Sequence, residues 1–161
     1  MLKGYHMQRS DREIGDQDEM MEVLKRGKYI TLALSRNNDP YIVTLSYGLD
    51  ERGASLYFHS SAKGAKLEII RENPKACGTV IEDLGYQHNE CSHKYRSVVL
   101  TGRIVEITGL DEKKEGMLTM FRHLESEPDA MKERFLSKDA DHSRVNVLKM
   151  DIEEMTGKES C

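Results

Sequence analysis

One short segment of the chain combines the residue types that bind phosphate groups in proteins. Residues 56–66 read LYFHSSAKGAK and place Ser60, Lys63 and Lys66 around Gly64. The unpaired backbone N–H groups at a helix N-terminus attract an anion, and hydroxyl and ammonium groups add further hydrogen bonds. A glycine lets the backbone approach the ligand closely. The spacing predicts a phosphate site here, provided that a strand precedes the segment and a helix follows it.

The same segment has a simpler interpretation. Ser61 would cap the helix, and Lys63 and Lys66 would form a solvated helical face. The sequence matches neither the Gly-x4-Gly-Lys-Ser/Thr phosphate loop nor the G-x-G-x-x-G dinucleotide motif. Both interpretations therefore stay open at the level of spacing alone.

A second cluster contains three side chains of types that bind metal ions. His88, Cys91 and His93 lie within six residues, and His59 is a candidate for a fourth ligand in space. Their spacing differs from that of common zinc motifs. We therefore expect a polar loop and no metal site, and we keep a small metalloprotein as an alternative hypothesis.

Composition and charge limit the class of protein. The 161 residues include 24 basic and 28 acidic ones, for a net charge of −4, which excludes a strongly basic nucleic-acid binder. No apolar run approaches the length of a membrane span, and Met1–Ser10 lacks the apolar region of a signal peptide. Three cysteines favour free thiols in a reducing compartment. We expect a cytoplasmic protein without nucleic-acid or membrane partners.

Hydrophobic periodicity predicts six strands and three or four helices. Helices are expected at Asp16–Arg26, from Ala65 to the Asn73-Pro74 stop, around Met117–Leu124 with a Thr108–Asp111 capping box, and more weakly in Glu125–Asp141. The strands are expected at Tyr29–Ser35, Tyr41–Leu49, Ala54–Ser60, Ala76–Ile81, Tyr95–Thr108 and Val145–Ile152.

The turns between these elements predict how the strands are arranged. The first three strands follow one another across short turns and should form a meander, with Asn37-Asn38-Asp39-Pro40 as the first turn. Asp83–Lys94 has little apolar content and is expected to be a loop, and Glu153–Cys161 is expected to be a tail or a final turn. Gly102 should mark a bulge or a bend that curves the sheet. The fold class is therefore mainly β with flanking helices, a small antiparallel barrel.

The ordered set of these segments resembles a known family. Residues 41–47 (YIVTLSY), 56–60 (LYFHS) with 63–66 (KGAK), 95–103 and 153–158 are similar to the pyridoxamine 5′-phosphate oxidase-like FMN-binding split barrels, nearest the nitroimidazole-resistance (Nim-type) branch. The resemblance implies a six-stranded antiparallel split β-barrel. It also implies one domain over residues 12–158, with short tails at 1–11 and 159–161. Met7 is an alternative start of the chain.

The resemblance further implies a homodimer with FMN between the subunits. Ser60, Lys63 and Lys66 would hold the FMN phosphate, and Val43 and Thr44 would line the isoalloxazine ring. The other implied cofactor-binding residues are His59, which is also the candidate proton donor or substrate contact, and Tyr95, Arg96 and Ser97, from this subunit or its partner.

The function implied is that of an FMN-dependent oxidoreductase. Electrons would pass from a reduced nicotinamide or another donor to a small oxidant such as a nitroaromatic. The alternative is a flavin-binding carrier or sensor without turnover. The chain contains no Trp, whereas pyridoxamine 5′-phosphate oxidases themselves would lead us to expect a Trp-bearing C-terminal segment. We therefore expect a chemistry other than vitamin B6 oxidation.

Overall fold

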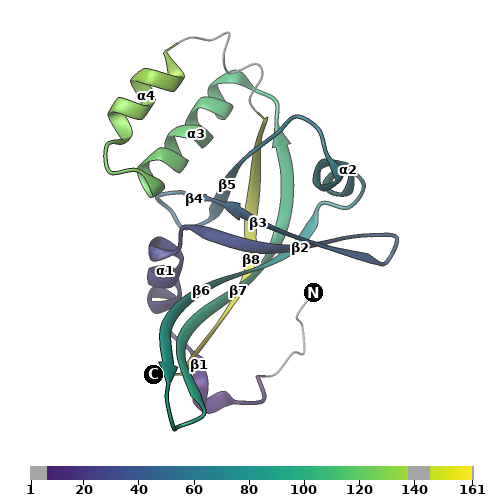
Figure 1. Ribbon diagram of the computed structural model, residues 1–161. Helices are drawn as coiled ribbons and strands as arrows, with labels where there is room; N and C mark the ends of the chain where they lie inside the picture. Colours follow the sequence, from purple (N-terminus) through teal and green to yellow (C-terminus); the bar gives the residue numbers. More distant parts are fainter. Residues whose placement is uncertain (1–6, 138–145, 161) are drawn as a thin grey trace.

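The computed structural model describes residues 7–137 and 146–160, and the described part is built on one antiparallel sheet (Figure 1). The strands are β1 (Glu13–Ile14), β2 (Tyr29–Arg36), β3 (Asp39–Ser46), β4 (Gly48–Leu49), β5 (Ser55–Ser60), β6 (Lys75–Gln87), β7 (Ser92–Ile107) and β8 (Asn146–Ser160). The helices are η1 (Ser10–Arg12), α1 (Gln17–Arg26), α2 (Ala65–Glu72), α3 (Leu110–Leu124) and α4 (Pro128–Leu136). The prediction of a mainly β fold with flanking helices is confirmed. The six longer strands are the expected ones, and β1 and β4 are additional.

The sheet curls into a barrel because the chain joins its two edges. The strand order is β3-β2-β6-β7-β8-β5-β4, with β1 beside β8. Tyr47 alone separates β3, at one edge, from β4, at the other. Its side chain is fully buried, and its hydroxyl donates a hydrogen bond to the carbonyl oxygen of Leu24 in α1. Burial raises the pKa of the Tyr47 phenol. Tyr47 therefore anchors to α1 the point where the chain passes from one edge of the sheet to the other.

The pairing of β5 corrects the predicted meander. β5 does not follow β3 in the sheet but lies between β4 and β8. The strand β8 also continues through Ser160, where Glu159 and Ser160 pair with Arg96 and Tyr95. The expected tail after Ile152 is therefore wrong, and most of it continues β8 along β7. Both errors concern pairing between segments far apart in the sequence.

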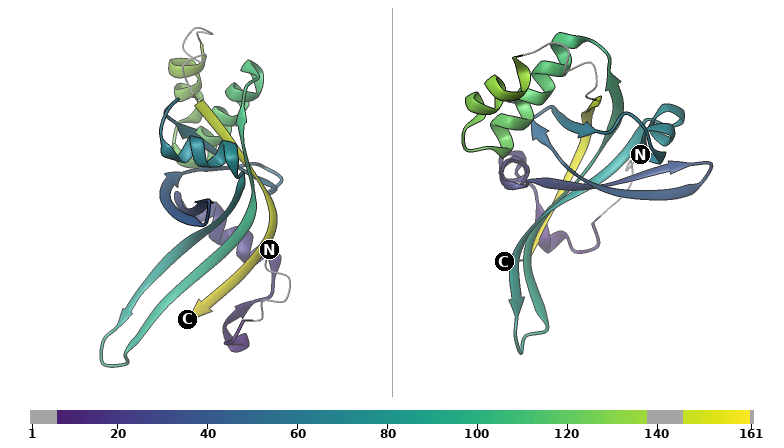
Figure 2. Two further views of the ribbon diagram at one scale, coloured as in Figure 1. Left: turned by 90° about the vertical axis from the view of Figure 1, so that its right-hand side faces the viewer. Right: turned by 45° about the horizontal axis from the view of Figure 1, so that its top comes forward.

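The expected loop Asp83–Lys94 is also wrong, because most of it is a β-hairpin. β6 runs to Gln87 and β7 starts at Ser92, which leaves a short turn at 88–91 with positive φ angles at Asn89 and Cys91. We call residues 83–95 the arm, since this hairpin projects beyond the barrel (Figure 2). Most of its side chains are exposed or half-buried on both faces. Its sequence therefore lacks the apolar alternation that identifies a strand.

Local backbone signals were predicted correctly. Asn37 and Asn38 both have positive φ, as a two-residue hairpin turn requires. The ladder between β7 and β8 shifts register between Thr101 and Gly102, which confirms the bulge. A Cβ on Gly102 would lie 2.0 Å from the carbonyl oxygen of Asp151. Only glycine fits at this bend.

The helix ends follow the predictions except at α3. The side chain of Asp16 caps α1 by accepting from the N–H of Asp18, and α2 ends before Asn73-Pro74. The N-cap of α3 is Gly109, without a side-chain cap, so the capping box predicted there is wrong. Figure 1 shows α1 beside the barrel, α2 at one end, and α3 with α4 at the top of the view.

The core fills the inside of the barrel and the space beneath α1 and α2. Its fully buried side chains come from every long strand except β3, together with α1 and α2; they include Val23, Leu24, Ile30, Leu56, Phe58, Leu67, Val98, Leu100, Leu148 and Met150. No helix among the described residues is long and apolar enough to cross a membrane.

Candidate functional site

The predicted phosphate segment forms the junction between β5 and α2. Gly64 is the N-cap of α2 with φ of 133°, a conformation that favours glycine, and no side chain caps the helix. The first N–H groups of α2 are therefore open to a ligand. The hydroxyl of Ser61 donates to the carbonyl oxygen of Lys63 at 2.8 Å. The interpretation in which Ser61 caps the helix is therefore wrong.

The two lysines of this junction differ in environment. Lys63 is exposed, whereas Lys66 is half-buried, and desolvation lowers the pKa of its ammonium group. Within residues 7–137 and 146–160, neither lysine forms an ion pair. Glu68, the acidic residue in the first turn of α2, lies 3.6 Å from Arg36. The junction thus holds two uncompensated cations at a helix N-terminus, which suits an anion.

Ser60 and His59 end β5 on opposite faces of the strand. Ser60 is 3% exposed, and its hydroxyl donates to the carbonyl oxygen of Ser61 at 3.0 Å. In this arrangement the Ser60 hydroxyl donates its hydrogen bond within the loop and does not donate to a ligand. His59 is exposed and lies opposite Val147 of β8.

Val43 and Thr44 lie next to each other in β3 and point to opposite faces of the sheet. Val43 packs against the core opposite Leu32, so a ligand outside the barrel can meet only its backbone. Thr44 is on the outer side, where its hydroxyl lies 3.0 Å from that of Thr31 in β2. Thr31 in turn stands opposite Thr79 of β6.

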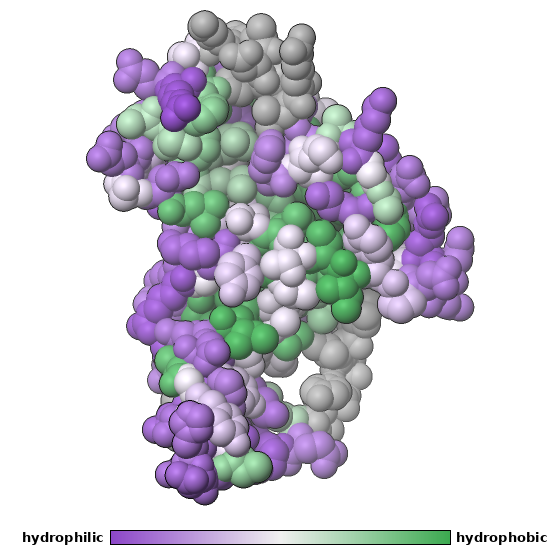
Figure 3. Space-filling model, in the orientation of Figure 1, coloured by the Kyte–Doolittle hydropathy of each residue, from purple (hydrophilic) through white to green (hydrophobic). Residues whose placement is uncertain are grey.

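These three threonines belong to an exposed apolar surface that we call the outer face. In each of these strands, the residue two positions away from the threonine faces the same side of the sheet. These residues are Tyr29 in β2, Ile42 in β3 and Ile81 in β6. They are 63%, 68% and 60% exposed. Figure 3 shows hydrophobic side chains gathered over β2 and β3 in this view. Large apolar side chains exposed on one face are typical of surfaces that contact other molecules.

The outer face continues into a pocket where β6 and β7 leave the barrel. The pocket has a volume of about 320 Å³ and is lined by Thr79, Ile81, Asp83, His93, Tyr95 and Ser97. The register of the hairpin sets Ile81 opposite Ser97 and Asp83 opposite Tyr95. We call this the β6–β7 pocket. Of the predicted cofactor residues, the structure places Tyr95 and Ser97 together here.

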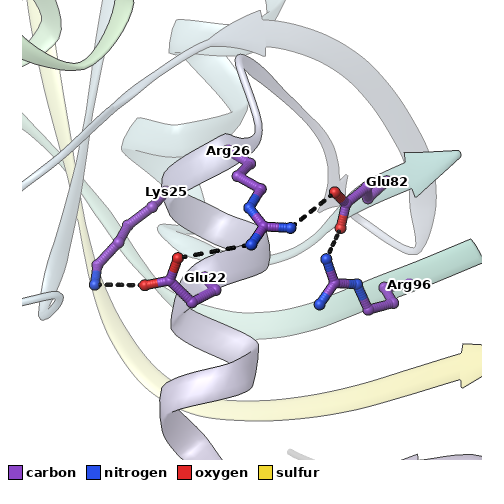
Figure 4. Close-up of polar contacts among 5 residues, drawn as sticks. All are labelled: Glu22, Lys25, Arg26, Glu82 and Arg96. Atoms are coloured by element: carbon purple, nitrogen blue, oxygen red, sulfur yellow. Dashed lines mark hydrogen bonds and ion pairs between the residues drawn. The ribbon is translucent and has the colours of Figure 1, made fainter. Parts of the chain in front are cut away.

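Arg96 is separated from its two neighbours by the alternation of the strand. Its guanidinium lies 2.5 Å from Glu82, which also pairs with Arg26 of α1 at 3.3 Å (Figure 4). Arg26 and Lys25 both lie near Glu22, at 4.0 and 2.9 Å. Arg96 is therefore held on the side covered by α1, and its charge is already partnered.

The phosphate segment and the β6–β7 pocket lie far apart along the sheet. His59 pairs with Val147, and Val147 pairs with Ile107 near the end of β7. Ten residues of β7 separate Ile107 from Ser97, which is about 33 Å of strand at about 3.3 Å per residue. The predicted site residues therefore form two groups within one chain.

The structure separates His59 from the other three candidate metal ligands. His59 is in β5, whereas His88, Cys91 and His93 lie on or next to the turn of the arm, at the opposite end of the molecule in Figure 1. Among the described residues, no group of three or more His, Cys, Asp or Glu side chains is arranged to hold a metal ion. One nitrogen of His93 is instead paired with Asp83 at 2.8 Å.

Sequence reasoning did not find Thr31, Thr79, Ile81 or Asp83. Their common property is that they point outward from paired strands, which depends on the register of β2, β3, β6 and β7. The alternation of Cys77, Thr79 and Ile81 with buried neighbours was a usable signal. It became uninformative beyond Asp83, where both faces are exposed.

Comparisons with known proteins agree with this architecture. A family model described as pyridoxamine 5′-phosphate oxidase matches residues 16–159. The chain belongs to the pyridoxamine 5′-phosphate oxidase family. This confirms the family predicted from the sequence and, with it, the split-barrel fold.

Three relatives illustrate the similarity. The structure of a candidate 5-nitroimidazole antibiotic resistance protein from Bacteroides thetaiotaomicron is 25% identical, with a TM-score of 0.76 over 91% of this chain and 86% of that one. An FAD-binding protein from Mesorhizobium loti is 26% identical, with a TM-score of 0.65 over 91% and 96% of the two chains. An uncharacterized protein of Rhizobium meliloti (strain 1021) is 26% identical over 148 residues, 89% of this chain and 92% of that protein.

Proposed function

We propose that this member of the pyridoxamine 5′-phosphate oxidase family is an FMN-binding oxidoreductase. It would take electrons from a reduced nicotinamide and pass them to a small oxidant such as a nitroaromatic. The observation that carries the proposal is the half-buried ammonium of Lys66 beside the uncapped start of α2, without an acidic partner among the described residues. A buried charge without a counter-ion is costly and indicates an anionic ligand. The names of two relatives, an FAD-binding protein and a candidate nitroimidazole resistance protein, support it.

The residues at the β5–α2 junction fit the phosphate of a flavin. Lys66 and Lys63 would neutralise its charge, the first N–H groups of α2 would donate to its oxygens, and Gly64 would leave room for them. Ser60 would join only after its hydroxyl leaves the carbonyl of Ser61. When bound, the flavin supplies the electron transfer, and the protein supplies binding, orientation and the exclusion of water.

We propose further that the protein is a homodimer and that each flavin site draws on both subunits. Ten residues of β7 separate Ser97 from Ile107, the position level with His59, so Tyr95 and Ser97 would more readily meet a ligand held by the phosphate segment of the partner. The exposed outer face runs from Ile42 to the β6–β7 pocket, next to these residues. A second copy packed on this face would bury it. It would also bring the pocket of one subunit toward the phosphate segment of the other.

The test begins with the absorption spectrum of the purified protein. We expect a two-band flavin profile, FMN released on denaturation, and a dimer by sedimentation equilibrium. We also expect oxidation of NADH or NADPH by a nitroaromatic to exceed the rate with free FMN alone. A colourless protein that binds no added FMN contradicts the cofactor. A yellow protein with no turnover would be a flavin carrier or sensor and contradicts the enzyme.

A further inference from the structure

His93 and Asp83 form a pair that the proposed function does not use. The Nε2 atom of His93 lies 2.8 Å from Oδ1 of Asp83, and both residues line the β6–β7 pocket. The same oxygen of Asp83 accepts from the backbone N–H of Gly85 at 2.8 Å. These two contacts lower the pKa of the Asp83 carboxyl, with the hydrogen bond from His93 as the largest cause. The carboxylate is thus fixed from two directions and in turn orients the imidazole.

The backbone of the arm is shaped to hold this pair. The ladder between β6 and β7 shifts register between Asp83 and Tyr86, where Gly85 has φ of 97°. Bulges of this kind often redirect side chains beside functional sites. The ring of Tyr86 meets the ring of His93 edge-on, with centroids 5.9 Å apart. The imidazole is therefore restrained by a carboxylate and an aromatic ring, and its second nitrogen has no hydrogen-bond partner among the described residues.

The lining of the pocket indicates what it can bind. Its wall combines the side chain of Ile81 and the ring of Tyr95 with the hydroxyls of Thr79 and Ser97. An apolar wall with a few convergent polar groups suits a small planar molecule. Asp83 occupies Nε2 and leaves Nδ1 of His93 for a ligand; when both ring nitrogens carry a proton, Nδ1–H donates to an oxygen acceptor. Aromatic molecules with a nitro group have this combination of a flat ring and acceptor oxygens.

We propose that the β6–β7 pocket binds the aromatic oxidant and that His93, positioned by Asp83, is the hydrogen-bond donor to its nitro group. This deepens the proposed function and rests on it for the reaction, but ligand binding can be measured separately. The hydroxyl of Tyr95 would be a second donor from the facing strand. The arm thus becomes a substrate-recognition element rather than a loop.

The test uses the full chain, with whatever flavin it carries, labelled with ¹³C in its histidine rings. The His93 signal is assigned by its loss in His93→Gln, and nitrobenzene is titrated with toluene as the ligand of similar shape without acceptor oxygens. We expect nitrobenzene to shift the His93 signal saturably and to bind at least tenfold more tightly than toluene. His93→Gln and Asp83→Asn should each weaken nitrobenzene binding at least fivefold, whereas flavin affinity stays within twofold.

His88→Gln is the matched control. The ring of His88 also meets the Tyr86 ring edge-on, with centroids 5.4 Å apart, but His88 does not line the pocket. We expect this variant to bind nitrobenzene as the unmodified protein does. Circular dichroism and sedimentation of all three variants check that the fold and assembly are retained.

The outcomes separate this proposal from the proposed function. An unmoved His93 signal at saturating nitrobenzene, equal binding of toluene, or an equal loss in His88→Gln overturns the pocket assignment while the flavin chemistry stands. Loss of flavin affinity in His93→Gln also overturns it, because His93 would then contact the cofactor and not the oxidant. A protein that holds no flavin but still binds nitrobenzene at His93 overturns the proposed cofactor and keeps the pocket.

Discussion

Replacing Lys66 by Gln should weaken the binding of FMN and stabilise the flavin-free protein. A hydrogen bond to a charged group contributes about 1.5–3 kcal/mol. Lys66 is half-buried and has no acidic partner among the described residues, so we take about 2 kcal/mol, or about a 30-fold rise in the dissociation constant. Lys63 is exposed, and Lys63→Gln should stay within about fivefold, since exposed charge pairs contribute about 0.2–1 kcal/mol.

The stability effect has the opposite sign because a cation is unfavourable at a helix N-terminus. Removing the Lys66 cation from the start of α2 should raise the free energy of unfolding by about 0.3–1 kcal/mol. For a chain of this size, that raises the Tm of the flavin-free protein by about 1–3 °C. Lys75→Gln, at the exposed start of β6, is the matched control and should change neither quantity.

The assay is the quenching of flavin fluorescence, run with FMN and with riboflavin. Riboflavin lacks the phosphate, so Lys66→Gln should bind it as the unmodified protein does. The difference between the two ligands isolates the contact between Lys66 and the phosphate. Equal losses for FMN and riboflavin would refute this reasoning, because Lys66 would then act on the ring or on the fold. Unchanged FMN binding would show that the phosphate lies elsewhere.

Three further predictions test the fold and the assembly. Gly102→Ala should cost at least about 2 kcal/mol, because its Cβ would meet the carbonyl oxygen of Asp151; urea denaturation measures this, and Gly15→Ala, with nothing within 4 Å of the new Cβ, should be nearly neutral. Burial lowers the pKa of His123, so the folded state binds fewer protons than the unfolded state near the unfolded pKa of about 6.5, and stability falls as the pH falls through that range. The loss between pH 7.5 and 5.5 should be smaller in His123→Gln, and parallel stability curves would contradict the assignment. Ile42→Asp on the outer face should convert the proposed dimer to monomers in sedimentation equilibrium, and a dimer of unchanged affinity would place the interface elsewhere.

Features decided by a few neighbouring residues could be predicted from the sequence. The two-residue turn at Asn37-Asn38, the bulge at Gly102 and the end of α2 before Pro74 each depend on the φ preference or the missing N–H of one residue. The phosphate segment belongs to the same group, because strand, loop and helix follow one another within residues 56–72. Such features need no knowledge of the distant chain.

Features that depend on pairing between distant segments were missed. The meander was expected because consecutive strands are usually neighbours, but β5 pairs with β8, about 90 residues later. The arm has no buried face from which alternation could be read, and its strands are defined only by their pairing with each other. The β6–β7 pocket requires that pairing and the shift at Asp83, so it is visible only in three dimensions.

The position of β8 in the sheet has a consequence for synthesis of the protein. β8 is the last strand that the structure describes, yet it lies between β7 and β5, pairing with β7 from Val147 to Ser160 and with β5 from Asn146 to Asp151. A nascent chain that has completed β7 therefore presents two open strand edges, because the strand that joins them has not left the ribosome. Such edges invite pairing with other chains. We expect the growing chain to need shielding during this interval, and the split barrel to close only once β8 has been made.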